Sequence, residues 1–141
     1  MKKLMLITAM AFLAFAMHKS ANAQVIKVGG GAELRTSPPA AFIVKATYNL
    51  GVLDESLGTS VDFMLIPDLE TNLDIHYAFL NDFGIKAYGL GGVNYFGNFG
   101  VNIGTGVNYN ISDALDAFGE VKYIIKNDPE ASIKIGVLYY L

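Results

Sequence analysis

The most constraining feature of this sequence is a period of two in its apolar residues. In the stretch 131–141, Ile133, Ile135 and Val137 alternate with polar or small residues. Such alternation is typical of β-strands, whose successive side chains point to opposite faces. Eight alternating runs follow Gln24, separated by Gly, Asn, Asp and Pro, which supply turn geometry. They lie at about 25–35, 41–50, 59–66, 71–80, 84–95, 98–109, 114–126 and 131–141.

Eight short runs with regular turn signals predict an all-β domain, either a barrel or a sandwich. No stretch after Gln24 has a convincing helical pattern. The choice between a soluble barrel or sandwich and a membrane barrel depends on which face of each strand is turned toward the interior.

Residues 1–23 differ from the rest and have the composition of an export signal. Two lysines precede an apolar run at 4–17, and Ala21 and Ala23 form a small-x-small pattern. The run is shorter than the roughly 20 apolar residues that a membrane-spanning helix needs. We therefore expect 1–23 to be a cleaved signal peptide and 24–141 to be the mature domain. An uncleaved anchor helix is the alternative.

Composition excludes several classes of function. The chain has no Cys, which excludes disulfides, thiolate metal sites and a lipid-modified N-terminal Cys. Beyond residue 23, seven Lys and Arg face thirteen Asp and Glu. With no basic patch, nucleic acid is not an expected partner.

The two faces of the predicted strands differ in chemistry. In 98–109, Phe99, Val101 and Ile103 share one face, whereas Gly and Asn occupy the other. An eight-stranded barrel interior is just wide enough to be filled by side chains, so the bulky apolar face would not fit inside. The polar, glycine-rich face would. A soluble surface is usually roughly 25–35% charged, whereas this chain is 16% charged.

We therefore predict an eight-stranded antiparallel up-and-down transmembrane β-barrel whose apolar face meets the lipid bilayer. Its expected location is the outer membrane of a Gram-negative bacterium, and its expected state is a monomer. A secreted or periplasmic soluble β-sandwich that binds a partner is the alternative.

Aromatic residues near the strand ends are expected to form two interfacial girdles, because amphipathic rings favour the headgroup region. With both chain termini in the periplasm, the girdle on that side comprises Tyr48, Tyr77, Phe79, Tyr109 and Tyr139. The opposite girdle comprises Phe42, Tyr95, Phe99 and Tyr123.

The polar face is expected to form an ionic network inside the barrel, because charges removed from water must be paired or hydrated. The predicted members are Lys27, Glu33, Arg35, Lys45, Asp62, Asp74, His76, Lys86, Asp116, Glu120, Lys122 and Lys134. Since eight strands leave no open channel, we predict a plugged interior with a structural or surface role. A narrow conducting pore is the alternative.

In the stretch 100–126, a glycine-alternating strand ends in Tyr109, a tight turn follows at 110–113, and Glu120 and Tyr123 form an acidic-x-x-Tyr pattern. This stretch resembles the late hairpin of the small outer-membrane barrels known as the OmpX/OmpA-like "porin family". The resemblance implies the barrel fold and an outer-membrane location. It also implies that the barrel-assembly machinery recognises the last strand. The residues at those positions are Val137, Tyr139 and Leu141, where the family usually ends in an aromatic residue.

No catalytic, cofactor or metal site is expected. His76 is the single histidine after residue 23, and one histidine without thiols is not a metal-ligand set. A Ser60–His76–Asp62 cluster on adjacent strands would suit a lipid-modifying barrel enzyme. We consider that alternative less favoured than a hydrogen-bonded interior histidine.

Overall fold

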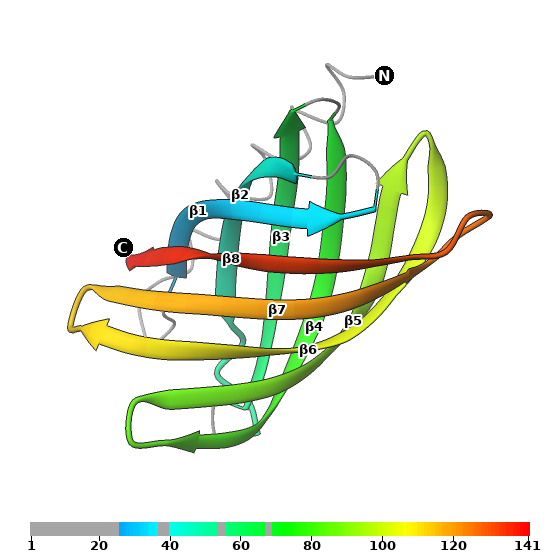
Figure 1. Ribbon diagram of the computed structural model, residues 1–141. Coiled ribbons are helices and arrows are strands. Elements are labelled where there is room, and N and C mark those ends of the chain that lie inside the picture. The colour runs from blue at the N-terminus through cyan, green and yellow to red at the C-terminus, as the bar shows by residue number, and fades with distance from the viewer. Residues whose placement is uncertain (1–25, 37–39, 54–55, 67–68) are drawn as a thin grey trace.

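The fold is a closed barrel of eight antiparallel strands (Figure 1). The computed structural model describes residues 26–36, 40–53, 56–66 and 69–141; the expected signal peptide at 1–23 lies outside them. The strands are β1 (Ile26–Arg35), β2 (Ala40–Asn49), β3 (Leu57–Ile66), β4 (Glu70–Asp82), β5 (Ile85–Phe96), β6 (Asn98–Ser112), β7 (Leu115–Ile125) and β8 (Glu130–Tyr140). The predicted all-β fold and its eight strands are confirmed.

Closure takes place between the first and the last strand. Each strand pairs with its neighbour in sequence, and β1 also pairs with β8, where Gly30 faces Val137. A sandwich would leave unpaired edges between two sheets, whereas this sheet has none. The soluble β-sandwich alternative is therefore wrong for this chain.

The up-and-down order gives the barrel two distinct ends. We call the end where β1 begins and β8 ends the terminal end; the β4–β5 and β6–β7 turns also lie there. The opposite end, which holds the β5–β6 and β7–β8 turns, is the distal end (Figure 1). Among the described residues, no helix is long and apolar enough to cross a membrane.

Glycines permit the close approach of β1 and β8 at the closing seam. A Cβ atom on Gly31 would lie 2.0 Å from the carbonyl oxygen of Ile135. On Gly136 it would lie 2.3 Å from the carbonyl oxygen of Gly30. Side chains cannot occupy these positions without separating the backbones, so the glycine-rich start of the domain has a direct role in closure.

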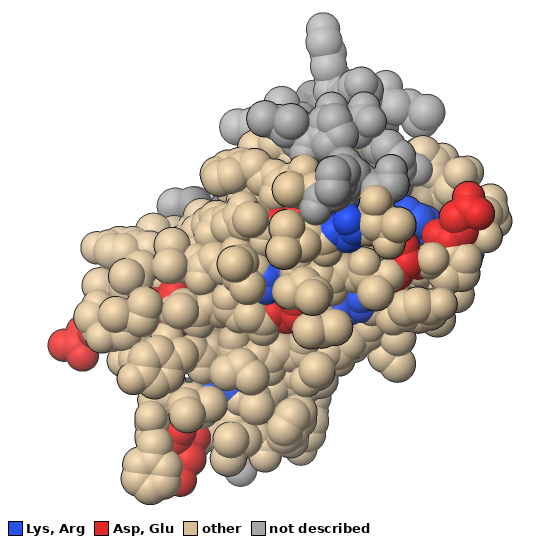
Figure 2. Space-filling model, viewed as in Figure 1, with Lys and Arg blue, Asp and Glu red and all other residues tan. Residues whose placement is uncertain are grey.

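Alternation along each strand divides inside from outside. On β7, Glu120 and Lys122 are buried, whereas Val121 and Tyr123, which alternate with them, are half exposed. Across all eight described strands, Asp82, the last residue of β4, is the only exposed charged residue. Figure 2 accordingly shows a wall that is mostly uncharged, with acidic side chains at its extremities. The inner face carries the charge.

Three β-bulges add apolar residues to the outer wall. The pairing register shifts in β3, β4 and β6, leaving Leu65, Phe79 and Ile111 without a partner. All three side chains are exposed. A bulge places two residues opposite one and increases the local twist, which helps a sheet to curve.

Two strands extend beyond their predicted ends. β4 continues through Asp82, so the expected turn at 81–82 is wrong; the chain reverses at Phe83 and Gly84, with φ of 51° and 76°. Consecutive positive φ angles are typical of the type I′ hairpin turn. β6 continues to Ser112, past the turn expected at 110–113.

Candidate functional site

The barrel interior is the candidate functional site, because the charged side chains gather there. All twelve residues predicted for the inner face lie on it: ten are buried, and Lys27 and Lys86 are partly buried near the terminal end. The inner-face acids of the described strands are Glu33, Asp62, Glu70, Asp74, Asp116 and Glu120, with Glu130 at the distal rim. The matching bases are Lys27, Arg35, Lys45, Lys86, Lys122 and Lys134, with Lys126 at the rim.

Asp62 is the centre of this ionic network. Its carboxylate lies 2.6 Å from the Nζ atom of Lys134, 3.2 Å from that of Lys122 and 3.8 Å from that of Lys45. Lys45 also contacts Glu120 at 2.5 Å, and Lys122 donates to Asp74. All six side chains are almost completely buried. Since an unpaired buried charge is costly, this mutual pairing is what permits the interior to hold so many ions.

At the distal end, Arg35 joins three carboxylates. Its guanidinium donates to Glu70 through two nitrogens, at 2.8 and 2.7 Å, in the paired geometry that suits a carboxylate. It also contacts Glu33 at 2.5 Å and Glu130 at 3.2 Å. Lys126 contacts Glu130 at 2.5 Å. These contacts link β1, β4 and β8 across the interior at this end.

Three asparagines connect the carboxylates of the centre and the distal end. The Asn94 amide donates to Glu70 at 2.5 Å and to Asn72 at 2.9 Å. The Asn102 amide donates to Asn72 at 3.0 Å and to Asp74 at 2.9 Å. The interior therefore contains hydrogen bonds as well as ion pairs.

Sequence reasoning missed Tyr88, a large buried residue of the interior. Its ring stacks on that of His76, with centroids 4.6 Å apart and planes 11° apart, and its hydroxyl donates to Glu120 at 2.8 Å. Gly106 leaves room for the ring, because a Cβ atom there would lie 2.5 Å from Tyr88 Cζ. Tyr88 lies two residues beyond Lys86, and residues two apart on a strand share a face. The predicted inward position of Lys86 therefore also implied an inward Tyr88.

Glu70 and an apolar cluster were also missed. Glu70 has the parity of Asn72 and Asp74, but it lies just before the predicted run at 71–80. The apolar cluster on the inner face consists of Ala41, Ile43, Met64, Phe118 and Leu138. The interior is thus charged but not uniformly polar.

The Ser60–His76–Asp62 cluster forms only in part. Ser60 Oγ lies 2.9 Å from His76 Nε2, but the contacts of Asp62 are to lysines and to Asn72. Both Ser60 and His76 are buried. In the part of the chain that the structure describes, no group of three His, Asp or Glu side chains is arranged to hold a metal ion.

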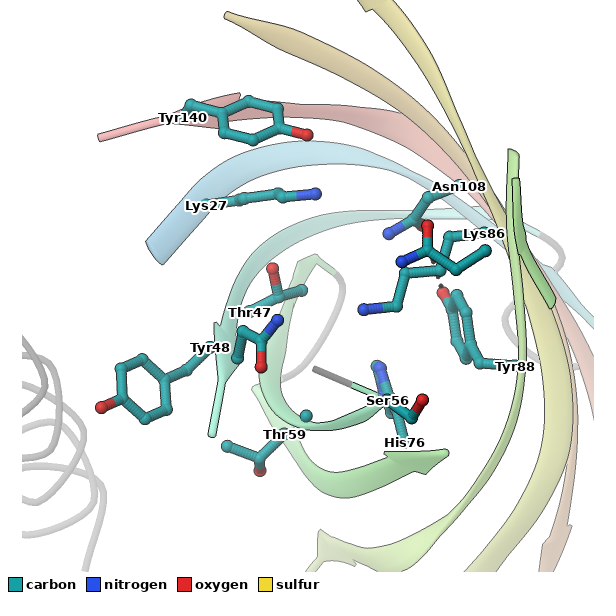
Figure 3. Close-up of a pocket in the computed structure, with 13 residues that line it drawn as sticks. Lys27, Thr47, Tyr48, Ser56, Thr59, His76, Lys86, Tyr88, Asn108 and Tyr140 are labelled. Carbon is teal, nitrogen blue, oxygen red and sulfur yellow. Dashed lines mark hydrogen bonds between the residues drawn. The ribbon is translucent and has the colours of Figure 1, made fainter. Parts of the chain in front are cut away.

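A cavity of about 200 Å³ lies inside the terminal end of the barrel (Figure 3). Lys27, His76, Lys86, Tyr88 and Tyr140 line it, together with hydroxyl and amide side chains. Asp116 holds the outer part of this region by accepting from Lys27 at 2.5 Å and from Tyr140 at 3.0 Å.

Solved structures share this architecture. The N-terminal β-barrel domain of Pseudomonas aeruginosa OprF matches with a TM-score of 0.63 at 14% identity, covering 83% of this chain and 97% of that chain. A de novo designed transmembrane β-barrel matches with a TM-score of 0.66 at 16% identity, covering 83% and 95%. The chain has the fold of the small outer-membrane β-barrels.

A third barrel of this fold is Ail, the attachment invasion locus protein of Yersinia pestis. It matches with a TM-score of 0.57 at 15% identity, covering 84% of this chain and 97% of that chain. No protein-family model and no curated protein matches the sequence. At these identities the likeness concerns the fold alone.

On this small outer-membrane β-barrel fold, the residues expected in the two girdles lie on or beside the outer wall. Tyr48 and Tyr95 are partly buried, and Figure 3 shows the Tyr48 ring turned away from the lumen. The remaining ones are exposed: Phe42, Tyr77, Phe79, Phe99, Tyr109, Tyr123 and Tyr139. Val137, Tyr139 and Leu141, the expected assembly signal, are exposed as well.

Proposed function

We propose that this chain is an integral outer-membrane β-barrel protein of a Gram-negative bacterium, exported by a cleaved signal peptide at 1–23. The observation that carries the proposal is the outer wall, where exposed charge within the described strands occurs only at Asp82, the last residue of β4. The wall instead exposes large apolar side chains such as Ile75, Ile103 and Ile135 on β4, β6 and β8. Soluble proteins rarely expose apolar patches above a few hundred Å², whereas a lipid-facing barrel requires such a surface.

We further propose that the interior is a structural plug and that the protein has a structural or surface-contact role. The support is the paired centre, where Asp62 and Glu120 accept from lysines and Asn72 joins neighbouring carboxylates. Eight strands enclose a space that side chains can fill. A conducting path would require these buried ion pairs to separate.

A lipid-modifying enzyme remains the less favoured proposal. The Ser60–His76 contact is the observation in its favour. A nucleophile activated by histidine normally also needs a third group that orients the histidine, and a reachable hydroxyl. Asp62 is engaged by lysines and Ser60 is 2% exposed, so the proposed role includes no catalysis.

The proposed partners follow from the outer surface. They are the lipid bilayer and the barrel-assembly machinery, which would recognise Val137, Tyr139 and Leu141 on the last strand. We propose a monomer that binds no nucleic acid and belongs with the OmpX/OmpA-like barrels.

Gel mobility and membrane fractionation together test this proposal. We expect the protein to be in the outer-membrane fraction and to migrate as a folded species in cold SDS, with a changed mobility after boiling. A soluble periplasmic protein without a mobility change would contradict the membrane location. Stable, large conductance steps in planar bilayers would contradict the plug while leaving the location intact.

A further inference from the structure

The cavity at the terminal end is a polar space that the ionic network leaves unfilled. Its volume of about 200 Å³ would hold about six water molecules at the density of the liquid. It is lined by polar side chains of several strands, and His76 and Tyr88 lie at its inner limit (Figure 3). It is therefore large enough for a small polar ligand with part of its hydration.

Two lysines reach the cavity from opposite walls. Lys27 comes from β1 and Lys86 from β5, and these strands are four positions apart in either direction around the closed barrel. Figure 3 shows both side chains extending into the cavity. Lys27 also pairs with Asp116 at 2.5 Å, so an anion between the two lysines would share the Lys27 ammonium with that carboxylate and meet the Lys86 ammonium from the other side.

Among the residues that the structure describes, no carboxylate lines the cavity. The nearby acids lie beyond the lining and have partners of their own. Asp116 accepts from Lys27, Asn110 and Tyr140. Glu120 accepts from Lys45 at 2.5 Å and from the Tyr88 hydroxyl at 2.8 Å. An anion in the cavity would thus avoid direct contact with a like charge.

Neutral donors complete the lining. Thr47 contributes a hydroxyl from β2, Ser56 one from the segment before β3, and Asn108 an amide from β6 (Figure 3). Donors placed around a cation pair suit an oxyanion that accepts several hydrogen bonds at once, and phosphate is a tetrahedral oxyanion with several strong acceptor oxygens. A lysine ammonium is a compact charge that binds phosphate well.

We propose that the cavity at the terminal end binds a small phosphate-class anion, either inorganic phosphate or a phosphate monoester, held between Lys27 and Lys86. This site depends on the barrel fold and not on the proposed membrane location. If the proposed orientation is also right, the site opens toward the periplasm.

Titration with inorganic phosphate tests the proposal. The full mature chain is folded in an uncharged maltoside detergent, which adds no phosphate of its own, and amide NMR signals are followed. We expect saturable shifts near Lys27, His76 and Lys86. Lys86→Gln should weaken the affinity at least about tenfold, since it removes a charged hydrogen-bond donor to the anion. Lys86→Arg should retain binding.

Lys126→Gln is the matched control, because Lys126 lies at the distal end, where it contacts Glu130 at 2.5 Å. It should bind phosphate as the unchanged chain does. The absence of saturable shifts at millimolar phosphate, equal affinity in Lys86→Gln, or the same shifts with chloride would each overturn the proposal. Should Lys86→Gln fail to show the mobility of a folded barrel, Lys86→Met provides the same test.

Discussion

Asp62 is the carboxylate that pairs with three of the buried lysines. Its fully buried carboxylate lies within 4 Å of three ammonium groups, those of Lys45, Lys122 and Lys134. Asp62→Asn leaves these cations with one counter-charge fewer, and removing one partner of a buried pair typically costs about 3–5 kcal/mol. We expect the free energy of unfolding, measured by urea titration in phospholipid vesicles, to fall by about that amount.

Asp82→Asn is the control for this substitution at the residue scale. Asp82 is exposed at the end of β4, and its Oδ1 atom accepts from the backbone nitrogen of Phe83, which an amide oxygen can also do. Asp82→Asn should change the free energy of unfolding by no more than about 0.5 kcal/mol. Similar values for the two variants would contradict the central role of Asp62.

The inner position of these charges could be predicted, whereas their partners could not. A period of two fixes the face of every residue within a strand, which is why Lys45 and Glu120 were both expected inside. That they meet at 2.5 Å depends on bringing together residues 75 positions apart in sequence. Such distances follow from barrel closure and strand tilt, which no local pattern contains.

At the scale of strands, the seam between β1 and β8 depends on residues without side chains. Gly31→Ala would place a methyl group 2.0 Å from the Ile135 carbonyl oxygen, so the two strands must separate. Overpacking of this kind typically costs about 1–3 kcal/mol. We expect a lower temperature for the loss of the folded band in SDS gels, and slower folding into vesicles.

Gly89→Ala on β5 is the matched control, because a Cβ atom there meets nothing within 4 Å. It should leave the folded band unchanged or make it more resistant to heat, since alanine restricts the unfolded chain more than glycine does. If both variants lowered the heat resistance of the folded band equally, the cause would be replacement of glycine by alanine in general and not a steric clash at the seam.

The strands themselves were predictable, but their irregularities were not. Alternation identified all eight, yet the bulges at Leu65, Phe79 and Ile111 arise from cross-strand pairing, which a single strand does not show. The turn at Phe83 was missed because phenylalanine rarely takes a positive φ. The terminal cavity was missed for a similar reason, since it is defined by side chains from several strands at once.

At the scale of the whole molecule, the distribution of polarity is the reverse of that in a soluble domain. A soluble protein keeps charge outside and apolar residues inside, whereas here Asp62 and Lys134 are fully buried and Ile103 and Ile135 are more than half exposed. The exposed apolar wall therefore depends on apolar surroundings, whereas the buried charges depend on their internal pairing.

Ile103→Lys tests that dependence directly. Ile103 is 58% exposed on the outer wall, between the aromatic residues Phe99 and Tyr109 of β6. In water, a lysine at an exposed position would change stability by less than about 0.5 kcal/mol, whereas near the middle of a bilayer it costs about 2–4 kcal/mol. For Ile103→Lys in vesicles, we expect the free energy of unfolding to fall by the larger amount, about 2–4 kcal/mol. The control is Asn98→Lys, at the exposed distal start of β6, which should lower it by no more than about 1 kcal/mol. Equal, small effects at both positions would mean that the wall does not face lipid.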